Sequence, residues 1–296
     1  MPYDRRNPVT RSAPAALAAI VCSAALAGCG AASEAAQGAR GPAAGAATAT
    51  TATAPAPDRT GPTAGGPRPL AGRTVVIDPG HNPGNFDHTR EINRKVDIGT
   101  ARKECDTTGT ATNATGGRPA YTEAAFTLDV SHRLRKLLEA GGATVVLTHD
   151  ADRPYGPCID ERARTGNEAK ADAVVSVHAD GSATGNRGFH VIVPAKVREG
   201  AADTGPIVAP SRRLGERIVS GFRGATGTNP ANYLGGGTGL DVRSDLGGLN
   251  LSTVPKVFVE CGNMRDPKDA ALLTSGVWRQ KAAQGIADGI VTYLQG

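Results

Sequence analysis

Aromatic residues are scarce in this chain of 296 residues, which contains five Phe, five Tyr and one Trp. A hydrophobic core must therefore be built mainly from Val, Leu, Ile and Ala. Although the formal net charge is +5, no run of basic residues is long enough to indicate binding to nucleic acid. The cysteines form no C-x-x-C pair, which argues against a cysteine zinc knuckle. The length allows one large domain or two small ones.

The N-terminus has the pattern of an export signal. Three arginines in the first eleven residues precede an apolar stretch, residues 13–27. This stretch is too short for a standard transmembrane helix, which needs about 20 residues. It leads into Leu-Ala-Gly-Cys, which ends at Cys29 and resembles the lipobox of bacterial lipoproteins. We predict a leader over residues 1–29 with lipidation of Cys29; the alternative is ordinary signal cleavage that leaves Cys29 unmodified or removes it.

Export places the mature chain in an oxidising compartment, where cysteines form disulfides. Beyond the leader, the cysteines are Cys105, Cys158 and Cys261. Cys105 and Cys158 both lie in polar, turn-rich segments, and we predict that they pair and tie two long loops together. Cys261 follows an apolar run, so we expect it to be a buried free thiol.

Residues 30–71 are dominated by Ala, Gly, Thr and Pro and show no apolar periodicity. We predict a disordered tether there, which as flexible coil spans roughly 35 Å root-mean-square. The folded domain is then expected over residues 72–296. We expect a monomer in the periplasmic or cell-wall space, which contacts the membrane only through a lipid on Cys29.

Apolar strand and helix patterns alternate along residues 72–296. Strands are predicted at 74–78, 143–148, 173–177, 188–193 and 257–259, and helices at 122–140, 159–170, 209–222, 266–273 and 277–294. Residues 82–121 are predicted to form a long functional loop, and residues 224–248 an irregular Gly-rich segment. Alternating strands and helices predict one α/β domain with a twisted, mostly parallel sheet flanked by helices.

Three of the predicted strands are followed by side chains that can bind a metal or move a proton. His81 comes after the first strand and an Asp-Pro-Gly turn, and His178 and Glu260 each directly follow an apolar run. The carboxyl ends of parallel strands share one edge of a sheet, so we expect these side chains to converge. Glu123 is a fourth candidate, because a carboxylate in the first turn of a helix is kept ionised by the helix N-terminus.

Two imidazoles and one carboxylate form a common catalytic zinc site, which leaves a fourth position for water. Zinc lowers the pKa of that water towards about 7, and a glutamate beside it can serve as the base. His81 and His178 are predicted ligands, with either Glu123 or Glu260 as the third ligand and the other as the base. The residues alone leave these two roles open. We interpret Asp78 as a cap of the Asp-Pro-Gly turn, with a role behind the ligands as the alternative.

Four segments resemble the motifs of the zinc-dependent N-acetylmuramoyl-L-alanine amidases of the amidase-3 type. They are Val-Val-Ile-Asp-Pro-Gly-His at 75–81, Glu123 at the start of an apolar helix, Ser-Val-His-Ala-Asp at 176–180 and Val-Phe-Val-Glu-Cys-Gly-Asn-Met at 257–264. The resemblance covers residues 73–294. The chain departs from the family pattern at residues 82–85, where Asn-Pro-Gly-Asn replaces the common Gly-Gly-x-Asp.

The resemblance implies that His81, Glu123 and His178 hold Zn²⁺ and that Glu260 is catalytic. It also implies hydrolysis of the amide between N-acetylmuramic acid and the L-alanine of the stem peptide, with peptidoglycan or a muropeptide as substrate. Two alternatives are a zinc peptidase that cuts within the stem peptide and a non-catalytic peptidoglycan-binding lipoprotein. The second alternative predicts a lost ligand or a lost base, whereas all four positions are filled in this sequence.

Overall fold

The structure is a computed structural model that describes residues 68–117 and 119–296. The predicted leader (1–29), with Cys29, and the predicted tether as far as residue 67 lie outside the described residues. The packed domain includes residues before the predicted boundary at residue 72. Leu70 is fully buried, and its backbone N–H donates to the carbonyl of Gly141 at 2.9 Å. None of the helices within the described ranges is long and apolar enough to cross a membrane.

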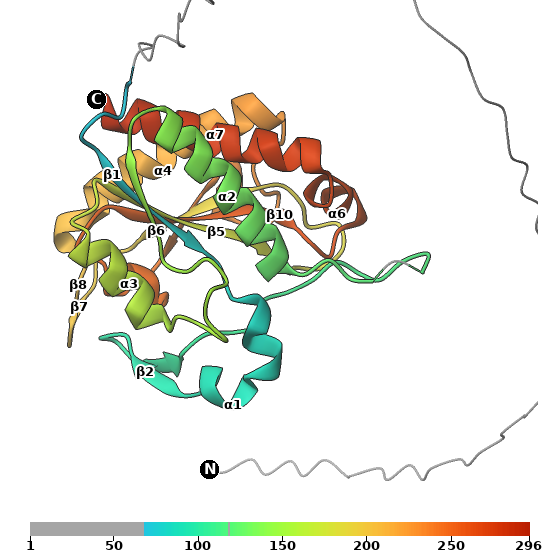
Figure 1. Cartoon of the computed structure of the whole chain (residues 1–296), viewed down its shortest axis with the longest axis horizontal. Helices are drawn as coiled ribbons and strands as arrows, with labels where there is room; N and C mark the ends of the chain where they lie inside the picture. Colours follow the sequence, from blue (N-terminus) through green and yellow to red (C-terminus); the bar gives the residue numbers. More distant parts are fainter. Residues whose placement is uncertain (1–67, 118) are drawn as a thin grey trace, which may run out of the picture. The chain divides into compact units, whose positions relative to one another are not determined.

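A six-stranded sheet in the order β4-β1-β5-β10-β6-β9 runs through the domain (Figure 1). Its strands are β1 (Thr74–Pro79), β4 (Thr144–Leu147), β5 (Ala173–Asp180), β6 (His190–Pro194), β9 (Leu240–Arg243) and β10 (Lys256–Asn263). Strands β4, β1, β5 and β10 are parallel, whereas β6 is antiparallel to β10 and parallel to β9. The predicted mostly parallel sheet is confirmed. The prediction that residues 224–248 are irregular is wrong in part, because strand β9 lies within this segment.

Seven α-helices accompany the sheet in the described part of the chain. They are α1 (Thr89–Ile92), α2 (Glu123–Ala140), α3 (Ile159–Glu168), α4 (Gly205–Thr226), α5 (Gly247–Asn250), α6 (Pro267–Leu273) and α7 (Gly276–Leu294). Helix α2 begins where the side chain of Thr122 accepts a hydrogen bond from the backbone N–H of Ala125, as expected for an N-cap. In Figure 1, α2, α4 and α7 lie together along one side of the sheet, with α3 on the other side.

The main core lies between the sheet and helices α2, α4 and α7. Successive side chains of a strand point to opposite faces, so Val75 and Ile77 of β1 enter this core while Val76 joins a smaller cluster on the other face. Phe126, Leu214 and other apolar side chains of the three helices complete the core. The second face of the sheet therefore keeps room for polar side chains near the carboxyl ends of its strands.

The segment 82–121, predicted as one long loop, contains several short elements. These are the 3-10 helix η1 (Pro83–Asp87), helix α1 and the hairpin of β2 (Lys95–Asp97) and β3 (Arg102–Glu104). A second hairpin of β7 (Arg198–Glu199) and β8 (Ala202–Asp203) precedes α4, and the 3-10 helix η2 (Gly235–Gly237) precedes β9. Cys105, after the first hairpin, forms a disulfide with Cys158 at the start of α3, and Cys261 is a buried free thiol. Both outcomes agree with the expectations from the sequence.

Candidate metal centre

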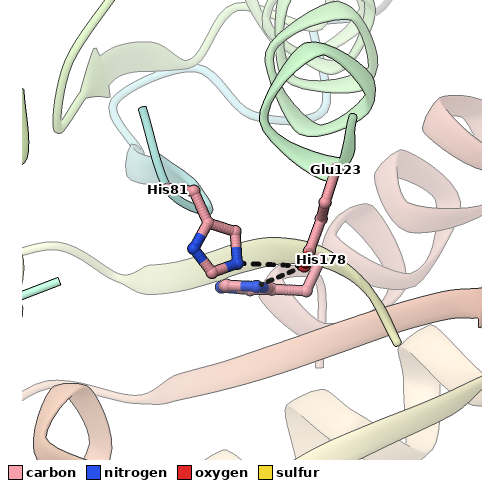
Figure 2. Close-up of side chains that lie close together, drawn as sticks. All are labelled: His81, Glu123 and His178. Carbon is pink, nitrogen blue, oxygen red and sulfur yellow. Dashed lines mark hydrogen bonds and ion pairs between the residues drawn. The ribbon is translucent and has the colours of Figure 1, made fainter. Parts of the chain in front are cut away.

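Three of the four predicted site residues meet at the carboxyl edge of the sheet. His81 follows β1, Glu123 is the first residue of α2, and His178 lies in β5. The Glu123 Oε1 atom lies 3.1 Å from His81 Nε2 and 3.0 Å from His178 Nδ1. Figure 2 shows both rings turned toward this carboxylate, and one potential ligand atom from each residue lies within 4.8 Å of the others. The set therefore offers two imidazole nitrogens and one carboxylate oxygen to a single ion.

Two glycines allow the three side chains to approach each other. A Cβ atom on Gly80 would lie 2.3 Å from Cε1 of His178, so even alanine there would collide with the ring. A Cβ atom on Gly109 would lie 2.8 Å from Oε2 of Glu123, and Gly109 also has a φ of +74°. The cluster is thus packed so closely that both positions require glycine.

Backbone groups hold the Glu123 carboxylate in place. Its Oε1 atom accepts a hydrogen bond from the N–H of Ala179 at 3.1 Å, and its Oε2 atom accepts one from the N–H of Thr110 at 2.9 Å. Burial opposes ionisation of Glu123, but the adjacent His81 and His178 outweigh it and lower the pKa of the carboxyl well below its usual value. Burial likewise opposes a charge on His81, but Glu123 raises the pKa of this imidazole above its usual value. The cluster therefore favours a positive charge at its centre, such as a metal cation would supply.

Glu260 lies beside this cluster on the neighbouring strand. The sequence predicted that Glu260 follows the end of a strand, but β10 continues through it to Asn263, because Glu260 pairs with His178 of β5 and His190 of β6. Its Oε2 atom is buried and has no hydrogen-bond partner among the described residues. Burial, with the negative charges of Glu123 and Asp180, raises the pKa of Glu260 well above its usual value. Such a carboxyl group is suited to carrying a proton.

A cavity of about 270 Å³ opens onto the two histidines. Gly80, His81 and His178 line it together with Phe258, whose ring stacks on that of His178 with 5.2 Å between centroids. Lys103 of β3 and Leu246, just before α5, also line it. A substrate group that enters this cavity therefore meets the side of the cluster formed by the imidazoles.

The cavity is also lined by buried charged side chains, Asp78, Asp106 and Arg162, which form a group that the sequence did not reveal. Asp78 accepts hydrogen bonds from Thr148 Oγ1 at 2.7 Å, Arg162 Nη1 at 2.8 Å, Ser176 Oγ at 2.9 Å and Lys256 Nζ at 3.1 Å. Burial opposes its ionisation, but Lys256 and Arg162 hold the pKa of Asp78 well below its usual range. The interpretation of Asp78 as a turn cap is therefore wrong. The side chain points into the interior and joins three strands to α3.

The comparisons with known proteins agree with this geometry. A family model described as N-acetylmuramoyl-L-alanine amidase matches residues 75–292. The N-acetylmuramoyl-L-alanine amidase Rv3717 of Mycobacterium tuberculosis is 40% identical over 229 residues, which are 77% of this chain and 89% of that protein.

Two crystal structures of related proteins have a similar fold. The N-acetylmuramyl-L-alanine amidase Ami1 of Mycobacterium smegmatis matches with a TM-score of 0.67 and 40% identity, over 76% of this chain and 98% of that one. Ami1 of Mycobacterium abscessus matches with a TM-score of 0.67 and 41% identity, over 76% of this chain and 100% of that one. The similarity thus covers the domain that carries the cluster.

Proposed function

The chain belongs to the amidase-3 type of N-acetylmuramoyl-L-alanine amidases, which cleave peptidoglycan, and on this premise we propose which residues carry the reaction. His81, Glu123 and His178 hold a Zn²⁺ ion, and Glu260 moves the proton. The observation that carries the proposal is the convergence of one carboxylate oxygen and two imidazole nitrogens from three distant parts of the chain. Both imidazoles line a cavity. The bond cleaved joins the lactyl group of N-acetylmuramic acid to the L-alanine of the stem peptide.

Zinc suits this donor set better than a hard cation does. Imidazole nitrogen is a common zinc ligand, whereas magnesium and calcium prefer oxygen ligands throughout. When bound, a zinc ion polarises the carbonyl of the scissile amide and lowers the pKa of a coordinated water to about 7. The remaining requirements of the reaction fall on the side chains of the protein.

Glu260 fits the role of the proton carrier. Its Oε2 atom is free to take a proton from the attacking water and to deliver it to the leaving L-alanine nitrogen. Burial and the nearby negative charges raise the pKa of Glu260 above its usual value, so this carboxyl holds a proton more readily than an exposed glutamate does. Glu123 is unsuited to this role, because both of its oxygens are engaged by backbone N–H groups and its pKa is lowered.

The cell-wall substrate and the disulfide place the enzyme outside the cytoplasm. We further propose that Cys29 is lipidated and anchors the chain to the membrane, and that residues 30–67 act as a tether between this anchor and the catalytic domain. The basis is the Leu-Ala-Gly-Cys motif that follows the apolar stretch of the leader. We also propose a monomer. All four proposed active-site residues come from one chain, so the reaction needs no residue from a second copy.

Metal analysis of purified variants tests the assignment of ligands and base. We expect about one zinc per wild-type chain, and none above background in His81→Ala and His178→Ala. Glu260→Gln is expected to keep its zinc and to lose activity by at least about 100-fold, because general acid–base catalysis contributes 10²–10⁴-fold. Loss of zinc from Glu260→Gln would instead make Glu260 a ligand, and full activity in this variant would remove it from the mechanism.

A further inference from the structure

We propose that Arg162 is a positioning residue that orients both metal-binding imidazoles through two buried carboxylates. It acts on His81 through Asp106 and on His178 through Asp78. This inference rests on the proposed function, because it takes the two histidines as metal ligands. It adds that their orientation and their tautomers depend on one buried guanidinium group.

The hydrogen bonds of Arg162 use all the donors that a guanidinium group has. Arg162 is 4% exposed, although it lies on a polar helix, α3. A guanidinium carries five N–H donors. Nε donates to Pro157 O at 2.9 Å. Nη1 donates to Asp78 Oδ1 at 2.8 Å and to Pro79 O at 2.6 Å. Nη2 donates to His81 O at 3.0 Å and to Asp106 Oδ2 at 2.9 Å. Lysine has only three donors on one nitrogen and cannot reproduce this set.

The first branch runs from Arg162 to His81. Asp106, held by Arg162, accepts a hydrogen bond from the N–H of Thr107 at 2.8 Å, and the carbonyl of Thr107 lies 3.0 Å from His81 Nδ1. A carbonyl oxygen can only accept, so the proton of the neutral ring resides on Nδ1. This leaves the lone pair of Nε2, the atom that faces Glu123, for a metal ion.

Arg162 also holds the main chain at His81 directly. His81 has a φ of +62°, an unusual conformation for a residue other than glycine. Arg162 donates to the carbonyl of His81 and to that of Pro79, two residues earlier. The guanidinium therefore stabilises the turn that directs the imidazole into the cavity.

The second branch runs from Arg162 to His178. Asp78 Oδ2 accepts the hydroxyl proton of Ser176 at 2.9 Å, and Ser176 Oγ lies 3.2 Å from His178 Nε2. Because the hydroxyl proton is directed to Asp78, Ser176 Oγ accepts from His178, whose proton therefore resides on Nε2. The lone pair of Nδ1 then faces Glu123 and a metal ion.

The two branches differ in how strongly they depend on Arg162. Asp78 is also bonded to Lys256 Nζ at 3.1 Å, so a second cation supports the His178 branch. Asp106 has no second cation within 4.0 Å among the described lysines and arginines, and its remaining hydrogen bonds come from Asn85 and Thr107. Loss of the guanidinium is therefore expected to disturb His81 more than His178.

Cobalt binding to the full chain tests this role with a readout other than activity. Arg162→Lys is compared with Arg164→Lys, a matched control on the same helix whose side chain is 56% exposed. We expect Arg162→Lys to weaken Co²⁺ affinity, measured by competition with a chelator, by about 10–100-fold, as is typical when a group that orients a metal ligand is lost. The visible absorption spectrum of the Co²⁺ form should change, and kcat should fall more than KM rises. Arg164→Lys should match wild type within twofold in every measurement.

A second variant decides the question if Arg162→Lys does not fold. Asp106→Asn keeps the shape of the side chain but removes the charge that faces Arg162, and it should weaken Co²⁺ binding in the same direction. The positioning role would be overturned if folded Arg162→Lys bound Co²⁺ with the affinity and spectrum of the wild type. If Arg162→Lys does not fold, the same result for folded Asp106→Asn would overturn it. Failure of the wild type itself to bind Co²⁺, or unchanged binding in His81→Ala, would instead overturn the proposed metal site. The two failures are therefore distinguishable.

Discussion

Individual residues around the two histidines leave little room for additional atoms. At Gly80, a Cβ atom would overlap the ring of His178, although the backbone there has no positive φ that would itself exclude alanine. The constraint thus comes from the metal site and not from the fold. A substitution at Gly80 therefore displaces one imidazole without changing any proposed ligand.

We expect Gly80→Ala to lower kcat/KM by about 100-fold, because a shift of about 1 Å in a catalytic group can have that effect. Gly224→Ala is the matched control, since a Cβ atom at Gly224 meets nothing within 4 Å and the residue lies inside α4. The control should keep full activity and gain about 0.5–1 kcal/mol in the free energy of unfolding, because alanine is the better helix former. Steady-state kinetics measure kcat/KM, and denaturant unfolding measures the free energy of unfolding. Wild-type kinetics in Gly80→Ala would mean that the ring has space the structure does not show.

The buried charge of Asp78 predicts a change in stability with pH. Replacement by Asn leaves Arg162 and Lys256 without their shared counter-charge, so we expect Asp78→Asn to lower the free energy of unfolding at pH 7 by about 3–5 kcal/mol. The folded-state pKa of Asp78 lies below its unfolded value of about 3.9, so its contribution is complete above that pH and is lost as the pH falls below it.

Urea unfolding between pH 7 and pH 2.5 measures this effect. The wild type should lose stability in acid more steeply than Asp78→Asn, because only the wild type has this carboxylate to protonate. Parallel curves for the two proteins, or a difference at pH 7 below about 1 kcal/mol, would show that the charge is not buried as described.

Among the elements, those with strong local signals were predictable from sequence. Strand β1 is a run of branched apolar residues closed by Pro79, and α2 combines a Thr122 cap with apolar residues at helical spacing. Strand β9 was missed because it is only four residues long and follows several glycines, although Leu240–Arg243 alternates apolar and charged residues as a half-buried strand does. The antiparallel direction of β6 depends on pairing with β10, which no local pattern encodes.

Local sequence patterns also determine which parts of the site could be predicted. His81, His178 and Glu260 were identified because each follows an apolar run, although His178 and Glu260 lie within longer strands. Arg162 was missed because nothing in the local sequence separates it from Arg164, two positions away. One is buried and the other exposed only through the packing of α3 against the segments around Pro79 and Asp106.

The disulfide joins the hairpin segment to α3 and closes a loop with a sequence separation of 53 residues. In the chain-entropy model, a cross-link of this span stabilises by about 4 kcal/mol. We expect the double variant Cys105→Ser, Cys158→Ser to lose a comparable amount in denaturant unfolding. Cys261→Ala, which removes a thiol without removing a cross-link, is the control and should cost about 1 kcal/mol. Equal stability of the double variant and the wild type would contradict a structural role for the bond.

At the scale of the whole molecule, we propose that anchoring and catalysis are separate. The four proposed active-site residues lie between positions 81 and 260, whereas the proposed lipidation site is Cys29. In the native host, Cys29→Ser is therefore expected to move the protein from the membrane fraction to the soluble exported fraction. Its kcat/KM on a soluble muropeptide should stay within twofold of wild type. Wild-type protein in the soluble fraction, with no attached lipid by mass spectrometry, would contradict the anchor.

The central claim is that one metal ion, held by His81, Glu123 and His178, enables the chain to hydrolyse the amide next to N-acetylmuramic acid. Its most direct test is mass analysis of the products of a defined muropeptide after incubation with the protein, with a strong chelator, and with chelator followed by excess zinc. We predict an intact stem peptide with a new L-alanine amino terminus and a free lactyl group, lost with chelator and restored by zinc. Equal cleavage with and without chelator, or a cut within the stem peptide, would contradict the account.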